Sequence, residues 1–195
     1  MLAGLALAPL IAAAACSGQA NGTPQGADAL VEVAADSGRG YVIEPLLPSE
    51  LVLQGAAGSL EDLLRTVERG LAESDTSRLG ELMFDEREFR DILFPAFPAA
   101  HPPINAGFDT VWILQYSDSY RGLRRLLREY GGRNVRILAV RFDHPGQDYV
   151  NFVLHETSRV DLTVDGQREE DRRLFGSVIQ VRDQWKVLTY PDDPS

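Results

Sequence analysis

Hydrophobic and polar positions along the chain divide it into a helical half followed by a strand half. From residue 60 onward, apolar residues recur every three or four positions, which is the spacing of one face of a helix. The stripe consists of Leu60, Leu63, Leu64, Val67 and Leu71. Ser59 and Asp62 stand before it with the spacing of a capping box. The pattern therefore predicts a first helix here, followed by shorter helices near residues 76–83 and 85–93.

A proline-rich stretch, residues 94–107, interrupts this helical pattern. Its prolines exclude a regular helix, so we expect a stiff apolar loop that serves as a lid or binding flap. Phe94, Phe97 and Ile104 are its candidate partner-binding residues. Asp109 is expected to cap a long helix that Gly131 and Gly132 end. The predicted apolar stripe of that helix is Val111, Trp112, Leu114, Leu123, Leu126, Leu127 and Tyr130.

The second half of the chain is typical of antiparallel strands. Strands are predicted over residues 134–142, 149–164, 174–181 and 185–190. Asp165-Gly166 signals a turn, with the polar residues 167–170 widening the loop. Successive strands of this kind form a meander. Helices first and a meander second predict an α+β domain with the helices on one face of the sheet.

The N-terminal segment suggests export. Residues 2–15 are all apolar or small, and the only cysteine, Cys16, follows directly. This run is shorter than the roughly 20 residues that a spanning helix needs and is typical of a signal peptide. Residues 13–16 (Ala-Ala-Ala-Cys) resemble the lipobox of bacterial lipoproteins, although that family more often has leucine at position 13 and a basic stretch at its start. The alternatives are an ordinary secretory peptide cut after Ala15, and a retained membrane anchor or a cytosolic protein.

The lipobox resemblance implies an organisation for the whole chain. Residues 1–15 would be removed, and Cys16 would carry acyl chains such as palmitate and anchor the protein to a membrane of the cell envelope. Residues 17–40 are rich in Gly, Ala, Ser, Asn and Gln and are typical of a flexible tether. We therefore expect a signal peptide (1–15), a lipidated cysteine with its tether (16–40) and a single domain (41–195, core about 59–190).

Two stretches of the domain resemble the nuclear transport factor 2-like superfamily, which includes the SnoaL-like proteins. One is the passage between helices at residues 70–75, with Leu79 and Leu82 after it. The other is the terminal hairpin, residues 174–188, whose last strand opens with Trp185 and Lys186. The resemblance implies a cone-like domain with a curved sheet and an apolar pocket between sheet and helices. Members include polyketide cyclases, ketosteroid isomerases, dehydratases and non-catalytic binding domains, so the fold does not define the function.

Charge and composition narrow the functional classes. The net charge of −10 argues against a nucleic-acid-binding protein, because such proteins need a surface that neutralises phosphates. A single cysteine excludes an internal disulfide, and the three histidines have no metal-ligand spacing. Neither a metal nor another cofactor is therefore expected. One region opposes the acidic balance: residues 120–136 are rich in arginine, and Arg124 and Arg128 are candidate partner-binding residues. The alternative is a solvated helix face.

The candidate chemistry is sparse. His155 and Asp161 share strand parity. On a cavity-facing side of the sheet His155 would be a base or a ligand-binding donor, and Asp161 would orient it or act independently. The alternative is that this side faces solvent. Tyr116 and Tyr120 are candidate proton donors. We expect a non-catalytic envelope lipoprotein that binds an apolar small molecule or an envelope protein. There are two alternatives. One is a small pocket enzyme of the cyclase, isomerase or dehydratase type, and the other is a structural envelope component.

Overall fold

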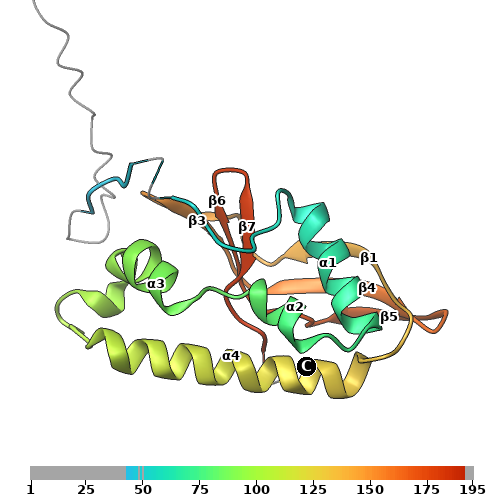
Figure 1. The fold of residues 1–195 in the computed structure, drawn as a ribbon. Helices are drawn as coiled ribbons and strands as arrows, with labels where there is room; N and C mark the ends of the chain where they lie inside the picture. The colour runs from blue at the N-terminus through green and yellow to red at the C-terminus, as the bar shows by residue number, and fades with distance from the viewer. Residues whose placement is uncertain (1–42, 48, 50, 192–195) are drawn as a thin grey trace, which may run out of the picture. The chain divides into compact units, whose positions relative to one another are not determined.

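The computed structural model describes residues 43–47, 49 and 51–191, all within one compact unit. The expected signal peptide, Cys16 and the expected tether lie outside the described residues. Within them the chain is a mixture of helices and antiparallel strands (Figure 1). The expected α+β class is thereby confirmed.

The first helices form at the positions that local sequence patterns predict. α1 (Leu60–Ala72) begins at Ser59, whose hydroxyl accepts the Asp62 N–H at 3.0 Å. α2 (Thr76–Glu81) is capped by Asp75. α3 (Glu86–Glu88) has a complete capping box between Asp85 and Glu88, and it continues into a π-helical turn, Phe89–Leu93.

The proline-rich stretch contains more helix than predicted. Two single 3-10 turns, Phe94–Ala96 and Pro98–Ala100, carry a proline in their first turn. Proline is tolerated there because the first N–H groups of a helix have no partner within it. α4 (Phe108–Tyr130) follows and ends at Gly131 as expected. Its N-cap is Gly107, so the prediction that Asp109 caps this helix was wrong. Asp109 lies instead in the first turn, where a carboxylate interacts favourably with the helix dipole.

The strands form two antiparallel sheets rather than one continuous meander. One sheet has the order β1-β4-β5 and the other β2-β3-β6-β7. Their bounds are β1 Val135–Phe142, β2 Gln147–Tyr149, β3 Phe152–His155, β4 Ser158–Val164, β5 Gln167–Arg172, β6 Val178–Val181 and β7 Gln184–Val187. The single strand predicted over residues 149–164 is divided among β2, β3 and β4. The loop predicted at 167–170 belongs to β5, an edge strand whose charged side chains are compatible with pairing on one side only.

Two hydrophobic clusters form the core, and α4 contributes to both. The first joins α1 and α2 to β1, β4 and the end of α4, with Leu63, Val67, Leu123 and Leu162 fully buried. The second surrounds Phe89, Ile92 and Leu93 and includes Phe108 and Trp112 from the start of α4. Leu114, predicted to lie inward, is 60% exposed. It is two positions from Trp112, about 200° around the helix, and therefore points to the opposite side.

The segment that follows β7, residues 188–191, lies along α4. Gln115 donates its side-chain N–H to the Leu188 carbonyl, and the Ser119 hydroxyl accepts the Tyr190 N–H at 3.0 Å. Gly122 provides the room for this approach, since a Cβ there would lie 1.9 Å from the Tyr190 carbonyl oxygen. These contacts fix the middle of α4 against the segment that follows β7, next to the pocket described below.

Candidate ligand-binding pocket

The lysine at position 186 is the only lysine of the chain, and its side chain is buried. β7 holds it between two neighbouring segments, because Trp185 bridges to Ala57 and Val187 to Met83. The side chain is only 2% exposed. Its Nζ donates to Oε2 of Glu88 at 2.7 Å and to the Met83 carbonyl at 2.9 Å. An ammonium group has three N–H donors, so one has no protein acceptor within the described part of the chain.

Glu88 is held as tightly as its partner. Its Oε1 accepts the Gln54 N–H at 2.5 Å, and its Oε2 accepts the Asp85 N–H at 3.1 Å in addition to Lys186. The second of these bonds is half of the capping box, so the turn that starts α3 also orients the carboxylate. A buried ion pair is stable only when further hydrogen bonds replace the lost hydration. Here backbone groups supply them.

Lys186 also lines a pocket of about 500 Å³. The pocket lies between the end of α2, the segment 83–85 that leads into α3, and one side of α4. Phe84, Met83, Tyr116 and Tyr120 form much of its wall, together with Lys186. The Lys186 Nζ lies 5.6 Å from the centre of the Phe84 ring, within reach of a cation–π interaction. The volume is in the range of small-molecule sites, which are mostly apolar with a few polar groups.

Tyr116 and Tyr120, two of the residues proposed from the sequence, therefore do lie in one site. They are one turn apart on α4, with ring centres 6.0 Å apart and planes 13° from parallel. Trp112 extends this stack, its ring centre 5.2 Å from that of Tyr116. The tyrosines are 43% and 40% exposed, so they form the outer wall of the pocket.

His155 and Asp161 do not line this pocket and do not contact each other. The His155 ring packs between Phe142 and Trp185, with ring centres at 5.0 and 5.1 Å. Its Nε2 is 3.3 Å from Oε1 of Gln180. The shared parity predicted for His155 and Asp161 does not hold across the turn between β3 and β4, where Thr157 has a positive φ.

Asp161 forms an ion pair instead. Its two carboxylate oxygens accept Arg141 N–H groups at 2.6 and 3.1 Å, and the Asp171 N–H donates to Oδ1 at 3.1 Å. The hydrogen bonds from Arg141, followed by the one from the Asp171 backbone, lower the pKa of Asp161 to about 2. At neutral pH this carboxylate is ionised and held by its partners.

The three residues proposed from the proline-rich loop have different surroundings. Phe97 packs against Phe89, Tyr149 and Phe152, with ring centres 5.8 to 6.0 Å apart. Phe94 contacts Phe108 edge to face at 5.4 Å. Both are half-buried parts of the second cluster, whereas Ile104 is 61% exposed. The loop thus directs its phenylalanines into the core, and Ile104 is the one of the three that is mostly exposed.

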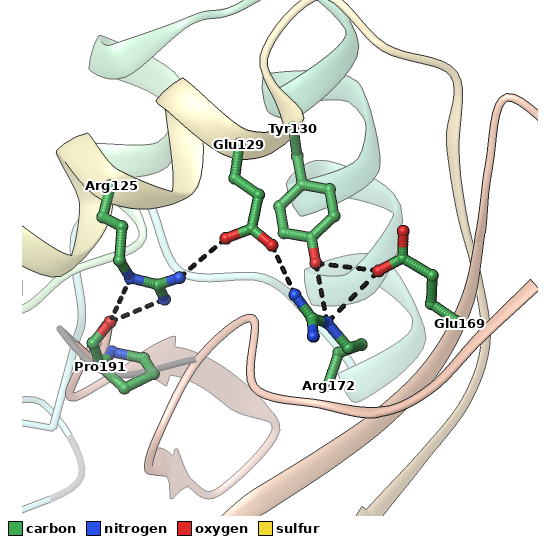
Figure 2. A network of polar contacts seen from close by, with 6 residues as sticks. All are labelled: Arg125, Glu129, Tyr130, Glu169, Arg172 and Pro191. Atoms are coloured by element: carbon green, nitrogen blue, oxygen red, sulfur yellow. Dashed lines mark hydrogen bonds and ion pairs between the residues drawn. The ribbon is translucent and has the colours of Figure 1, made fainter. Parts of the chain in front are cut away.

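The arginines of α4 fall into two kinds. Figure 2 shows Arg125 bound to Glu129 and the Pro191 carbonyl, and Arg172 of β5 bound to Glu129, Glu169 and Tyr130. Burial raises the pKa of Tyr130 to about 12, so its hydroxyl stays protonated in this network. The network joins the end of α4 to β5 and to Pro191 in the segment after β7. Arg124 and Arg128 are exposed and form no ion pair with any described residue.

Lys186 is the site residue that sequence reasoning missed. The signal was its rarity: 18 arginines and a single lysine are present, and the lysine lies in a strand of a core hairpin. Among the described residues no group of His, Cys, Asp and Glu side chains is placed to hold a metal ion, and no helix is long and apolar enough to cross a membrane. Comparison with protein-family models, curated proteins and solved structures finds no match to this chain.

Proposed function

We propose that this protein is a lipoprotein of the cell envelope whose domain binds an apolar small molecule without transforming it. The observation that carries the proposal is the pocket beside Lys186. Its volume of about 500 Å³ and its wall of Phe84, Met83 and tyrosines suit an apolar body. The remaining N–H of the Lys186 ammonium suits one oxygen acceptor of the ligand.

The chemistry of the site favours binding over catalysis. Glu88 is already held by three donors, and Lys186 is bound to Glu88 and to a backbone carbonyl. A general base needs a free lone pair within reach of the substrate, and Glu88 has its oxygens committed. The Lys186 side chain is therefore best suited to fixing the orientation of a ligand.

A cone-like fold similar to that of the nuclear transport factor 2-like superfamily remains our proposal for the architecture, with the helices on one side of the two antiparallel sheets. It is supported by the order of helices and antiparallel strands and by a pocket to which both helices and β7 contribute. The lipobox-like residues 13–16 support a lipid anchor at Cys16. Several acyl chains on one cysteine would hold the protein stably at a membrane, because a single chain gives only marginal binding.

A small pocket enzyme of the cyclase, isomerase or dehydratase type is the second candidate. It is favoured by the two tyrosines that line the same pocket as Lys186. Phenol hydroxyls can polarise a substrate carbonyl. This candidate requires turnover of a bound compound, whereas the leading one requires only saturable binding.

The pocket can be tested by filling it. Gly80 lines the pocket, and a Cβ at this position meets no atom within 4 Å. Gly80→Leu should therefore fill part of the pocket without displacing the surrounding side chains. We expect saturable binding of the fluorescent probe anilinonaphthalene sulfonate to the wild type, weakened about tenfold or more in this variant. Gly107→Leu is the matched control, since Gly107 is also open and lies outside the pocket. Equal affinity of the wild type and Gly80→Leu would contradict the proposal.

The anchor has its own test. A bacterial host expressing the full chain is grown with an alkyne analogue of palmitate, and the label on the protein is measured. We expect labelling of the wild type and none of Cys16→Ser. A label that persists in Cys16→Ser would show that the lipid is not on Cys16, and an unlabelled wild type would overturn the lipoprotein assignment.

A further inference from the structure

The outer face of α4 carries exposed apolar side chains and unpaired arginines side by side. Ile113, Tyr120, Arg124 and Arg128 follow one another at spacings of seven, four and four residues, so they share one face of the helix. Leu114 and Tyr116 flank them. Ile113 and Leu114 are each 60% exposed, and the two tyrosines are 43% and 40% exposed. We call these six residues the α4 outer face.

This face is separate from the side of α4 that packs into the protein. The buried residues of the helix are Ser119, Gly122, Leu123, Leu126 and Tyr130, and none belongs to the outer face. Within the described structure nothing covers Ile113 or Leu114. Large aliphatic side chains exposed together beside aromatic ones mark an interaction surface more often than isolated ones do.

The α4 outer face is positively charged, although the protein as a whole is acidic. α4 contains four arginines and three acidic residues, whereas the whole chain has a net charge of −10. Asp118 is paired with Arg121, and Glu129 with Arg125 and Arg172. Arg124 and Arg128 have no such partner among the residues that the structure describes. The partner of this face should therefore be anionic.

We propose that the α4 outer face docks on an anionic phospholipid bilayer. Helices that lie in a membrane interface carry aliphatic side chains, tyrosines and arginines on one face. The α4 outer face has the same combination. The stretch from Ile113 to Arg128 is about 22 Å long, because a helix rises about 1.5 Å per residue, so these side chains can lie together along a lipid surface. The proposal does not depend on Cys16. It brings Tyr116 and Tyr120, and hence the outer wall of the Lys186 pocket, close to the lipid.

The test uses the chain from residue 17 onward, which lacks the N-terminal apolar segment and Cys16 but keeps both hydrophobic clusters. It is sedimented with vesicles of phosphatidylcholine alone or mixed in equal parts with phosphatidylglycerol. We expect binding to the mixed vesicles that falls as salt is added, and little binding to phosphatidylcholine. Each arginine near anionic headgroups raises the affinity for the membrane about fivefold. The double change Arg124→Gln with Arg128→Gln should therefore weaken binding about 25-fold.

A matched control removes two other arginines. Arg69 in α1 and Arg182 in the turn after β6 are exposed, are not part of the α4 outer face and form no ion pair with described residues, so Arg69→Gln with Arg182→Gln changes the net charge equally. It should leave most of the binding in place. Ile113→Ser with Leu114→Ser should weaken binding at all salt concentrations. Equal loss in the two arginine pairs, or no binding by the parent chain, would overturn the proposal. A dimer in solution that the Ile113/Leu114 variant dissociates, without vesicle binding, would assign the face to a second copy instead.

Discussion

The Nζ of Lys186 lies 2.7 Å from Oε2 of Glu88, although 98 residues separate them in the chain, and both side chains are almost completely buried. This ion pair joins β7 to the last residue of α3, and its lysine lines the pocket. Because Glu88 is also half of a capping box, the pair couples a helix start to the sheet. It therefore serves both the stability of the fold and the polarity of the site.

Replacing Lys186 with methionine should destabilise the protein by about 3–5 kcal/mol, because Glu88 would remain buried without its counter-charge. Urea unfolding measures this. Lys186→Met combined with Glu88→Gln should cost less than Lys186→Met alone, since the uncompensated charge is gone. A Lys186→Met cost below about 1 kcal/mol would show that the pair is not buried as described.

Two glycines should respond to alanine in opposite directions. Gly80→Ala in α2 should raise the free energy of unfolding by up to about 1 kcal/mol, because alanine has the higher helix propensity and its Cβ meets nothing. Gly122→Ala in α4 should lower it by about 2 kcal/mol or more, since its Cβ would collide with the Tyr190 carbonyl. Thermal unfolding of both variants tests this. A stabilised Gly122→Ala would show that Tyr190 does not lie against α4.

Ser119→Ala should destabilise the protein by about 1–3 kcal/mol. The Ser119 hydroxyl is buried and accepts the Tyr190 N–H, which would lose its acceptor. Ser117→Ala is the control on the same helix, where the side chain is exposed, and should change stability by less than about 0.5 kcal/mol. Similar effects of the two changes in denaturant unfolding would contradict the described contact.

Acid should remove the contribution of Asp161 to stability. Its pKa in the folded protein is about 2, below the ordinary value of 3.8. A carboxyl group whose pKa is lowered by folding stabilises the protein above its unfolded pKa. That contribution declines as the pH falls through the folded value. The difference in unfolding free energy between the wild type and Asp161→Asn should therefore be full at pH values above about 4 and shrink toward about pH 2.

Asp183→Asn serves as the control for this pH series. Asp183 is exposed in the turn between β6 and β7 and has no ion pair with the described residues. The difference in unfolding free energy between the wild type and Asp183→Asn should stay nearly constant over the same pH range. A constant difference for Asp161→Asn as well would mean that the Arg141 ion pair does not hold in solution.

Helix positions were predictable because their signals are local. Ser59 and Asp85 act within four residues of themselves, and the stripe from Leu60 to Leu71 needs only the period of the helix. The same holds for Gly131 at the end of α4. These features follow from backbone hydrogen bonding and side-chain spacing, which do not depend on distant parts of the chain.

The candidate site was only partly predictable. Tyr116 and Tyr120 were proposed from the sequence and do line the pocket, whereas His155 and Asp161 were joined by strand parity that the β3–β4 turn interrupts. Parity holds only within an unbroken strand. Lys186 was overlooked because a lone lysine in a strand gives no local sign of a buried partner.

By itself the sequence determined the α+β class, the starts and ends of most helices and the buried stripe of α1, because these depend on short-range periodicity and capping. Only the tertiary structure decided how the strands divide between two sheets, which side of α4 stays exposed, and that Lys186 meets Glu88 beside a pocket. Each of these depends on contacts between segments far apart in the chain. Such contacts depend on how the whole core packs, so they cannot be predicted from local patterns in the sequence.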